Sequence, residues 1–362
     1  MGLILMKIVF LSYLHGFGGA EKQIIMLANA MAERGHDVTL ISICANNKCY
    51  DLDESVEYIF LPDKKTGILR IVYRYQNIKE KLKRIKPDIT VNFWFQSAYL
   101  TALMKKSITG KIIYSERGDP GDKEYSGMMG AVRSLTLPRI DGFVFQSKGA
   151  QSFFNESVLS RSTVIPNPVF VKAEDYPEVK ERRKVIVTVG RLHSQKNQKL
   201  LIEAFSLIAD QIPDYTLEIY GDGELKYELQ ELIDNLKLEE RVFLMGTSKK
   251  IHNLINDASL FVLSSDYEGL PNTLLEAMAL GIPCVSTDCS PGGAREIIED
   301  GIDGVITPVG DREKLADAIL HSIICGKETR VKAEKAKKKM RKYQKDIIYS
   351  TWEVFLKSLI DQ

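Results

Sequence analysis

The sequence predicts an α/β protein that consists of two doubly wound domains, each a parallel sheet with helices on both faces. Short apolar runs without polar alternation recur between helical patterns, which is typical of strands that are buried on both faces of a sheet. A charged stretch that contains prolines interrupts this pattern once, and the pattern then restarts. The chain has 362 residues, which is too long for one ordinary hydrophobic core. We therefore expect two domains that face each other across a cleft.

The first domain is expected to span residues 1–166. Its opening apolar run has no small-residue cleavage site, so we expect it to form the first buried strand rather than a signal peptide. The residue patterns predict strands at Lys7–Tyr13, Asp37–Ile43, Asp88–Phe93, Lys111–Ser115 and Phe143–Gln146. They predict helices at Glu21–Arg34, near Ile71–Lys86 and near Gln96–Lys105.

A linker is expected at residues 167–184, followed by a second domain at residues 185–340. Strands are predicted at Val185–Val189, Thr216–Tyr220, Val242–Leu244, Leu260–Leu263, Pro283–Ser286 and Gly304–Thr307. Helices are predicted at Gln198–Ala209, at Leu225–Leu236 and near Leu254, Leu275 and Leu315. Residues 341–362 carry a further helix pattern. It is interpreted either as a segment that crosses back to the first domain or as a solvated helix with an apolar stripe.

The composition is that of a folded protein without a strong overall charge. The formal net charge is +1, which argues against a dedicated nucleic-acid binder. The charges are unevenly spread, with 22 Lys and Arg against 16 Asp and Glu up to Arg161 and 27 against 32 after it. This asymmetry indicates either an anionic surface partner or ordinary solvated helix faces. Five cysteines without a CxxC pair fit a cytoplasmic protein that has no zinc or redox site.

A glycine-rich loop, HGFGGAEK, follows the first predicted strand. Glu21 occupies the position where a dinucleotide fingerprint requires its last glycine, and the second strand lacks the acidic end that holds a ribose in NAD enzymes. A nicotinamide cofactor is therefore not expected. Gly18 and Gly19 would allow a ligand to approach the backbone at a helix start, although a structural turn explains them equally well.

The first strand of the second domain ends in the loop VTVGRLHSQKNQ. Arg191 and Lys196 follow the carboxyl end of this strand, which is the edge of an open α/β sheet where ligands bind. Two cations at this edge suit a diphosphate, with Arg as a planar fork and Lys as a point charge. Taken alone, the same residues would be interpreted as solvated surface charges.

Two glutamates, Glu268 and Glu276, flank the start of a predicted helix in the segment SSDYEGLPNTLLEAMALGIP. Pro271 is expected as the first helical residue, so that the free N–H groups near Asn272 and Thr273 form a site for phosphate. One turn on, Glu276 could accept both hydroxyls of a ribose, while Glu268 could reach a sugar beyond the phosphates. Capping by an acidic first turn is the alternative, and it explains one glutamate at most.

These motifs together resemble the retaining glycosyltransferases of the family 4-like type. EGLPNTLLEAMALGIPCVST resembles the Glu-x7-Glu signature, and GGAE, GRL with a following Lys, IYGDGEL and PGGAREII occur in the family's order. The resemblance covers nearly the whole chain. It implies the GT-B fold of two Rossmann-like domains, with the nucleotide sugar mainly on the second domain and the acceptor mainly on the first.

The resemblance assigns a role to each matching residue. It implies that Glu276 holds the ribose, that Glu268 is the catalytic carboxylate at the donor sugar, and that the base lies near Thr247. Arg191 and Lys196 are expected to contact the diphosphate. Further donor contacts are expected at Leu270, Pro271, Asn272 and Thr273 around the helix start and at Gly18 and Gly19 from the other domain, while Gly221 and Gly223 are expected to shape a neighbouring loop.

One position departs from the family pattern. Many relatives carry a histidine near the reaction centre where this sequence has Arg117, within SERGDP. A fixed cation there could stabilise developing negative charge, but it cannot act as an acid or base at ordinary pH. A buried ion pair between Glu116 and Arg117 is the alternative. A DxD motif at Asp51 and Asp53 is interpreted as a turn before a strand and not as a metal site.

The resemblance implies sugar transfer with retained anomeric configuration and without a metal or other cofactor. We expect a UDP-sugar donor and a glycan or lipid-linked acceptor of cell-surface polysaccharide or glycolipid biosynthesis. The basic stretch Ile78–Lys86 would then meet anionic lipid heads, which implies a cytoplasmic protein that is peripheral on the inner face of the plasma membrane. The alternatives are a nucleotide-sugar epimerase or hydrolase of the same fold and a non-catalytic module that binds nucleotide sugars.

Overall fold

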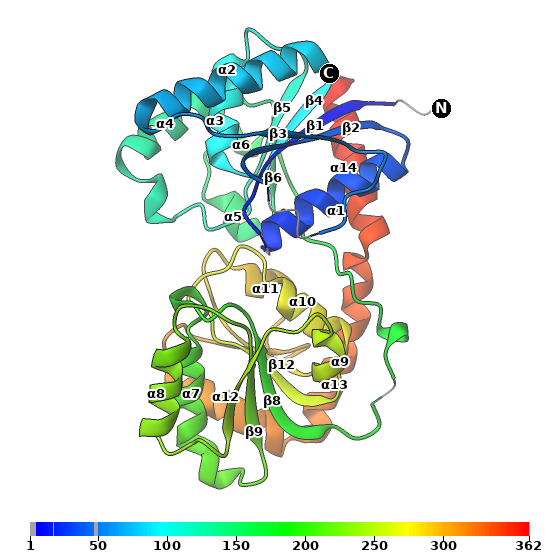
Figure 1. The fold of residues 1–362 in the computed structure, drawn as a ribbon. Helices are drawn as coiled ribbons and strands as arrows, with labels where there is room; N and C mark the ends of the chain where they lie inside the picture. The colour runs from blue at the N-terminus through cyan, green and yellow to red at the C-terminus, as the bar shows by residue number, and fades with distance from the viewer. Residues whose placement is uncertain (1–4, 17, 47–49, 178, 362) are drawn as a thin grey trace. The chain divides into compact units, whose positions relative to one another are not determined.

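The computed structural model describes residues 5–16, 18–46, 50–177 and 179–361. The chain divides into two compact units, the first made of Met1–Asn167 and Asp346–Gln362 and the second of Pro168–Lys345. Figure 1 shows that each unit contains a sheet with helices packed around it. The expected doubly wound α/β architecture is therefore present twice.

The first unit is built on a parallel sheet. Among the described residues, its strands pair in the order β3-β2-β1-β4-β5-β6-β7. The order reverses at β1, which lies between β2 and β4. In an open sheet of this type, ligands bind at the carboxyl ends of the strands where the order reverses. In the first unit these strands are β1 and β4. The strands are β1 (Lys7–Leu14), β2 (Asp37–Asn46), β3 (Glu57–Leu61), β4 (Ile89–Asn92), β5 (Lys111–Ser115), β6 (Gly142–Phe145) and β7 (Ser162–Val164).

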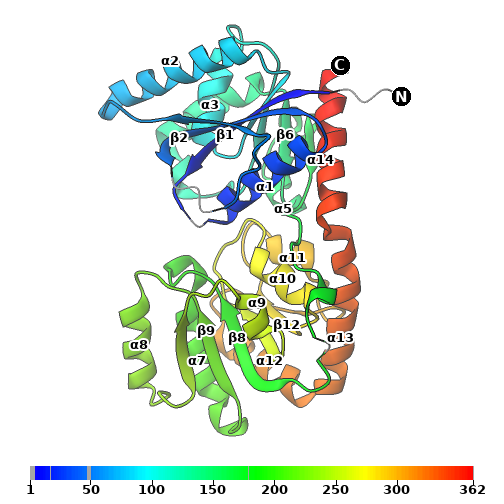
Figure 2. The ribbon, with the colours of Figure 1, turned by 45° about the vertical axis from the view of Figure 1, so that its right-hand side comes forward.

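Helices cover both faces of this sheet. Figure 2 shows α1 and α2 on opposite faces, and Ile78 of α2 packs with Leu100 of α3 over the strands. The helices of the first unit are α1 (Gly19–Glu33), α2 (Gly67–Ile85), α3 (Phe95–Met104), α4 (Gly127–Thr136), α5 (Lys148–Ser152), α6 (Glu156–Leu159) and the C-terminal α14 (Lys345–Ile360). Because both faces are covered, β4 and β6 are buried along their whole length, which explains the missing polar alternation.

Helix α14 belongs to the first unit and lies beside its sheet, as the red helix in Figure 2 shows. Trp352 and Leu356 of this helix are buried. A Cβ on Gly142, at the start of β6, would lie 2.7 Å from Cδ1 of Leu359 and 3.1 Å from Cζ of Phe355. Glycine at this position therefore allows α14 to approach the sheet closely.

The second unit repeats the construction with a parallel sheet of its own. Its described strands pair in the order β10-β9-β8-β11-β12-β13, and the order reverses at β8. The strands are β8 (Arg183–Val189), β9 (Thr216–Tyr220), β10 (Val242–Gly246), β11 (Ala258–Leu263), β12 (Cys284–Thr287) and β13 (Val305–Thr307). The carboxyl ends of β8 and β11 are thus the predicted place for a ligand in this unit.

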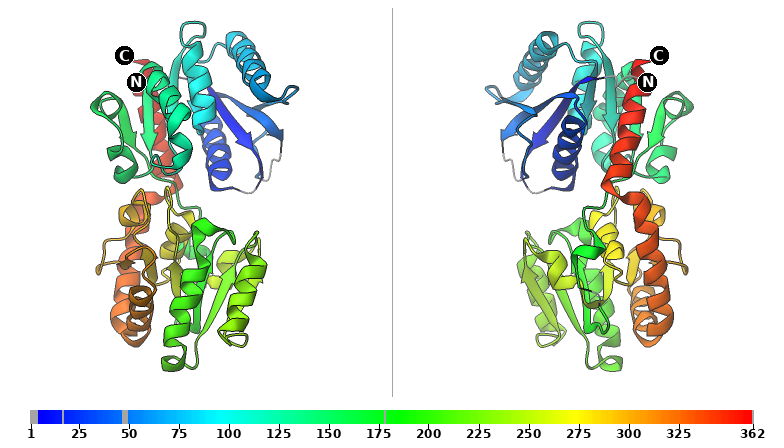
Figure 3. Two further views of the ribbon diagram at one scale, coloured as in Figure 1. Left: turned by 90° about the vertical axis from the view of Figure 1, so that its left-hand side faces the viewer. Right: turned by 90° about the vertical axis from the view of Figure 1, so that its right-hand side faces the viewer.

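Two separate apolar clusters fill the two sides of the second sheet. One cluster joins the strands to Leu201 of α7, Leu229 of α8 and Leu315 of α12. The other joins them to Leu275 of α10 and Ala336 of α13. Figure 3 shows these helices on either side of the sheet. The helices are α7 (Gln198–Ile208), α8 (Lys226–Asn235), α9 (Ile251–Ile255), α10 (Asn272–Ala279), α11 (Gly293–Ile297), α12 (Arg312–Ile324) and α13 (Gly326–Lys339).

The structure confirms the predicted strands and helices and adds elements that the patterns did not reveal. The strands at Lys111–Ser115 and Thr216–Tyr220 have the predicted bounds, and residues 1–4 of the expected first strand lie outside the described residues. Missed elements include β7, which has three residues, α4, and α13, which is rich in lysine. Within the described residues, none of the helices is both long and apolar enough to cross a membrane.

Candidate functional site

Two loops of the second unit are joined into one structure at the carboxyl ends of β8 and β11. The backbone N–H of Asp266 donates to the carbonyl oxygen of Gln195 at 2.9 Å. The Ser264 hydroxyl donates to the carbonyl oxygen of Lys196 at 3.0 Å, and the Asn197 side chain donates to the Asp266 carboxylate at 2.7 Å. These bonds fix the loop that carries Arg191 and Lys196 against the loop that carries Glu268.

Glu268 and Lys196 are direct partners. The Lys196 ammonium forms an ion pair with the Glu268 carboxylate, which also accepts a hydrogen bond from the Ser265 hydroxyl at 2.8 Å. The backbone N–H of Glu268 donates to the carbonyl oxygen of Ser290 at 2.7 Å. Glu268 is only 7% exposed, so its negative charge is held in place and neutralised by the lysine. The two side chains had been predicted for different parts of a ligand, and the structure brings them together.

Glycines bring the next loop close to this one. A Cβ on Gly221 would lie 1.8 Å from the carbonyl oxygen of Gly190, and one on Gly223 would lie 2.4 Å from the carbonyl oxygen of Leu192. Gly221 also has a φ of +148°, which disfavours other residues. The loops after β8 and β9 therefore lie backbone against backbone beside Arg191.

Helix α10 begins at Asn272, one residue later than predicted. Pro271 has an extended backbone, with ψ of 102°, and is the N-cap. Its carbonyl oxygen accepts from the backbone N–H groups of Leu274 and Leu275 at 3.2 Å each. The amides of Asn272 and Thr273 precede these bonds and occupy the turn in which a helix has no carbonyl acceptors of its own. The positive end of the helix dipole is therefore at this point.

Glu276 on α10 is held by a residue that the sequence analysis missed. Nε2 of His252, on α9, lies 3.1 Å from the Glu276 carboxylate, and the side chains are 23% and 14% exposed. The Tyr176 ring meets the His252 ring edge to face, with centroids 6.2 Å apart. Burial, together with Asp175 and Glu276, raises the pKa of Tyr176. No motif links His252 to Glu276, because they are 24 residues apart on different helices.

The other predicted donor residues of the second unit lie at the ends of the same strands. Arg191 follows β8 and is exposed, and within the described part of the chain its guanidinium forms no ion pair. Thr247 follows β10 and is exposed. Leu270 is 6% exposed and belongs to the apolar cluster under α10. Within the part of the chain that the structure describes, Arg191 is thus a cation without an ion-pair partner at the same edge as Lys196.

The predicted glycines of the first unit lie at the start of α1. Gly18 is the N-cap and Gly19 the first helical residue. A Cβ on Gly18 would lie 1.9 Å from the Glu21 carboxylate, so the helix start is closely packed against this side chain. The Tyr50 hydroxyl donates to the carbonyl oxygen of Gly18 at 3.3 Å. The contact of Gly18 and Gly19 with a diphosphate stays a prediction.

Arg117 is buried among aromatic rings in the first unit. Its Cζ lies 4.0 Å from the centroid of the Phe93 ring and 5.6 Å from that of Trp352, a residue of α14. Its Nη1 donates to the Asn167 side chain at 2.9 Å. Burial lowers the pKa of Arg117 to about 9, which still leaves the guanidinium charged at neutral pH. These contacts connect α14 to Asn167, and they give Arg117 a definite structural role.

The alternative ion pair between Glu116 and Arg117 is wrong. Among the described residues, the Glu116 carboxylate pairs with Arg133 at 3.3 Å and accepts a hydrogen bond from the Tyr114 hydroxyl at 2.6 Å. It also accepts the backbone N–H groups of Arg117 and Gly118. In the described residues, the Arg117 guanidinium forms no ion pair with this carboxylate, although the charge of Glu116 opposes the effect of burial on the pKa of Arg117.

Carboxylates at Asp51 and Asp53 lie in the turn before β3, as expected. The Asp53 carboxylate accepts hydrogen bonds from the backbone N–H and the hydroxyl of Ser55.

In the described residues, one group of side chains could hold a metal ion: His321, Cys325 and Glu328, whose ligand atoms lie within 4.8 Å of one another. This group is at the junction of α12 and α13 and contains none of the predicted site residues.

Sequence comparisons match both units. Residues 17–172 match the family described as Glycosyltransferase Family 4, and residues 172–340 match Glycosyl transferases group 1. An uncharacterized glycosyltransferase of Methanocaldococcus jannaschii is 30% identical over 73% of this chain and 74% of its own length. The chain is a glycosyltransferase of the family 4 type. Glu268 and Glu276 of this glycosyltransferase are the two ends of the family's Glu-x7-Glu segment.

Further comparisons extend over almost the whole glycosyltransferase. It is 27% identical to the lipopolysaccharide 1,6-galactosyltransferase of Salmonella typhimurium, over 97% of this chain and 95% of that protein. Its fold is similar to that of HepE from Anabaena in complex with UDP, with a TM-score of 0.79, 21% identity and coverage of 98% and 100% of the two chains. The glycosyltransferase therefore has the GT-B fold that the sequence predicted.

Proposed function

We propose that this glycosyltransferase moves a sugar from a UDP-sugar to a glycan or lipid-linked acceptor of cell-surface polysaccharide or glycolipid biosynthesis, with retained anomeric configuration and without a metal ion. The observation that carries the proposal is the arrangement at the carboxyl ends of β8 and β11. There Glu268 and Lys196 pair, Arg191 has no ion-pair partner among the described residues, and helix α10 starts within the same group of loops. The UDP complex of HepE and the name of the Salmonella relative support the donor and acceptor classes.

The chemistry follows from the charges at this edge. The leaving diphosphate gains negative charge as the sugar departs, and fixed cations and helix amides stabilise that charge most in the transition state. Arg191, Lys196 and the first amides of α10 supply this stabilisation in place of a metal ion. A phosphate that draws Lys196 away from Glu268 leaves the carboxylate available to the hydroxyls of the donor sugar. A leaving-phosphate oxygen then takes the acceptor's proton on the same face of the sugar.

A panel of nucleotide sugars tests the donor assignment. Thermal shift with UDP-, GDP-, ADP- and CMP-sugars should show the largest stabilisation for one UDP-sugar, because only ligands of the folded state raise the melting temperature. NMR of the product should then show that the new glycosidic bond has the same anomeric configuration as the sugar in the donor. Stabilisation by another nucleotide alone would overturn the UDP assignment, and an inverted product would overturn the retaining mechanism.

We further propose that the protein acts at an anionic membrane on the cytoplasmic side, and helix α2 supports this proposal. Ile68, Leu69, Ile71 and Val72 in its first two turns are 77%, 62%, 43% and 47% exposed. Ile68, Ile71 and Val72 share one helix face because of their spacing. The predicted basic stretch Ile78–Lys86 continues the same helix. Exposed aliphatic residues next to several cations are typical of a helix that lies in an anionic lipid interface.

Liposome co-sedimentation tests this membrane contact. Ile68→Ser should weaken binding to vesicles that contain anionic lipid, since it removes an inserted aliphatic side chain. Ile324→Ser is the matched control, because Ile324 is 69% exposed but lies on α12 of the other unit. Binding that is the same for neutral and anionic vesicles, or equal losses in both variants, would contradict the proposal.

A further inference from the structure

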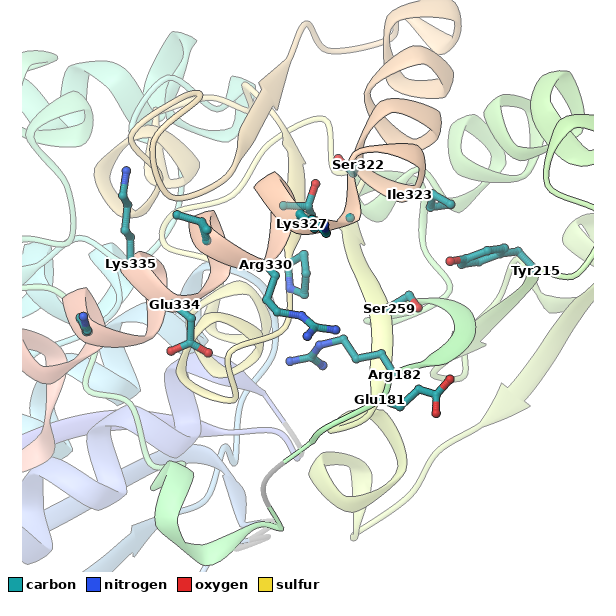
Figure 4. A pocket seen from close by; sticks show the side chains of 15 residues that line it. Glu181, Arg182, Tyr215, Ser259, Ser322, Ile323, Lys327, Arg330, Glu334 and Lys335 are labelled. Atoms are coloured by element: carbon teal, nitrogen blue, oxygen red, sulfur yellow. The ribbon is translucent and has the colours of Figure 1, made fainter.

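A cavity of about 800 Å³ lies within the second unit, at the edge of the sheet opposite to Lys196 and Glu268. Arg182, Tyr215 and Pro283 line it, and each directly precedes a strand, β8, β9 and β12 respectively. The other wall is formed by the end of α12 and by α13, as Figure 4 shows. The buried strands of this sheet lie between its amino edge and its carboxyl edge. The cavity is therefore separate from the candidate donor site.

The cavity lining carries more positive than negative charge. Its cations are Arg182, Lys327, Arg330, Lys335 and Lys338, and its carboxylates are Glu181 and Glu334. In the described part of the chain, the four cations on α13 form no ion pair. Elsewhere on the same helix, Lys332 pairs with Glu328 at 2.8 Å and Lys339 pairs with Asp303 at 2.7 Å. Among the described residues, the cations of the cavity therefore outnumber its carboxylates, and those on α13 are not held in ion pairs.

Two guanidinium groups meet inside the cavity. Arg182 is anchored because its Nη1 donates to the carbonyl oxygens of Asn256 and Ala258, at 3.0 and 2.9 Å. Figure 4 shows Arg182 and Arg330 pointing toward each other, while Glu181 points away. Burial lowers the pKa of Arg182, and the charge of Arg330 acts in the same direction, whereas Cys284, Asp257 and Glu334 act in the opposite direction. Like charges that face each other repel, and an anion between them removes the repulsion.

We propose that this cavity is a second ligand site of the protein, for a small soluble molecule that carries a phosphate or diphosphate group. Guanidinium groups bind phosphate oxygens through two parallel N–H donors, which Arg330 can offer. Arg182 donates through Nη1 and Nη2 to the carbonyl oxygens of Asn256, Ala258 and Gly281, and it is therefore a fixed positive charge beside Arg330. A volume of about 800 Å³ is within the usual range for small-molecule sites. Ser259 and Tyr215 add hydroxyl groups for the rest of the ligand. This inference is independent of the proposed donor site.

Isothermal titration calorimetry with inorganic pyrophosphate tests the site on the full chain. The titration is carried out with saturating UDP, so that a functional donor site is already filled. Arg330→Gln should weaken pyrophosphate binding by about tenfold or more, as expected for the loss of a charged hydrogen-bond donor. Arg330 is exposed, so the variant should keep its fold and its melting temperature. The affinity for UDP should not change.

Arg312→Gln is the matched control. Arg312 lies on α12 of the same unit, pairs with Glu313 at 2.9 Å and does not line the cavity. This variant loses the same charge and should bind pyrophosphate as the wild type does. Unchanged pyrophosphate affinity in Arg330→Gln, equal losses in both variants, or no pyrophosphate binding by the wild type would each overturn the second site. A wild type that binds pyrophosphate but not UDP would overturn only the UDP assignment.

Discussion

The two edges of the sheet in the second unit differ in the partners that surround their cations. At the carboxyl edge, Lys196 pairs with Glu268 and Glu276 contacts His252, so most charged groups have partners before any ligand arrives. At the amino edge, Arg182 and Arg330 face each other without a carboxylate between them. Both edges carry ion pairs, since Arg183 pairs with Asp257 and Lys184 with Asp214 at the amino edge. In the cavity lining, however, five cations face two carboxylates.

This difference teaches what each edge can recognise. A nucleotide sugar has hydroxyl groups and a diphosphate, so its site needs hydrogen-bond acceptors and cations together. Carboxylates placed beside cations can exchange their partners when a ligand binds. A site in which cations outnumber carboxylates binds mainly the anionic part of a ligand and contributes little to selection among sugars. The following experiments change one edge at a time.

The largest effect is expected from Glu268→Gln. This change keeps the size of the side chain but removes its charge, and it leaves the partly buried Lys196 without its partner. Sugar transfer should fall by more than about a hundredfold in kcat/KM, because a charged hydrogen bond contributes roughly 1.5–3 kcal/mol and the unpaired lysine adds a further cost. Steady-state kinetics measures this loss, with the exposed Glu239→Gln as control.

Ligand titrations refine the role of Glu268. The variant should bind free UDP as the wild type does and should bind the intact donor more weakly, because the carboxylate is assigned to the sugar. Equal losses for UDP and for the donor would contradict this assignment.

The next largest effect is expected from Glu276→Ala. Because Glu276 is proposed to accept the ribose hydroxyls, its loss should weaken binding of UDP and of the UDP-sugar alike, by about 1.5–3 kcal/mol. Calorimetry measures both affinities, and pyrophosphate binding at the amino edge should stay unchanged. An unaltered affinity for UDP would refute the ribose assignment.

Much of the second unit was predictable from sequence because its ligand edge is built from local patterns. Strands end in GRL and in SSDYEG, and helix α10 starts directly after Pro271, so sequence order alone places Arg191 and Glu268 at one edge. Direct partners were not predictable. Nothing in the spacing shows that Lys196 would pair with Glu268, 72 residues away, because that contact depends on how two loops pack.

The first unit shows the same limit more strongly. Arg117 was recognised from its position after a predicted strand, but its cage comes from Phe93 and Trp352, which are far apart in the sequence. Likewise, Glu116 pairs with Arg133 of α4, a helix that the patterns missed. Tertiary packing determines such contacts, and a single sequence carries no signal for them.

A smaller effect is expected from His252→Ala. The imidazole touches Glu276 at 3.1 Å and orients it, so its loss should weaken UDP binding about twofold to tenfold, in line with a net hydrogen-bond contribution of about 0.5–1.5 kcal/mol. His252→Gln should restore part of the affinity, because the amide can donate to the carboxylate. His321→Ala is the control, and the turnover number at saturating donor should be unchanged. Full affinity in His252→Ala would show that Glu276 is oriented without this contact.

The smallest effect is expected from metal removal. This experiment tests whether the cations at the carboxyl edge stabilise the negative charge of the leaving diphosphate without a metal ion. Arg191, Lys196 and the start of α10 already provide positive charge for a diphosphate, so EDTA should leave the rate of sugar transfer unchanged. The metal-capable group at His321, Cys325 and Glu328 lies at the α12–α13 junction, and Glu328 is occupied by Lys332. His321→Ala should therefore transfer sugar at the wild-type rate with or without EDTA. If EDTA stops turnover and added Mg²⁺ or Mn²⁺ restores it, a metal ion rather than these cations stabilises the leaving diphosphate.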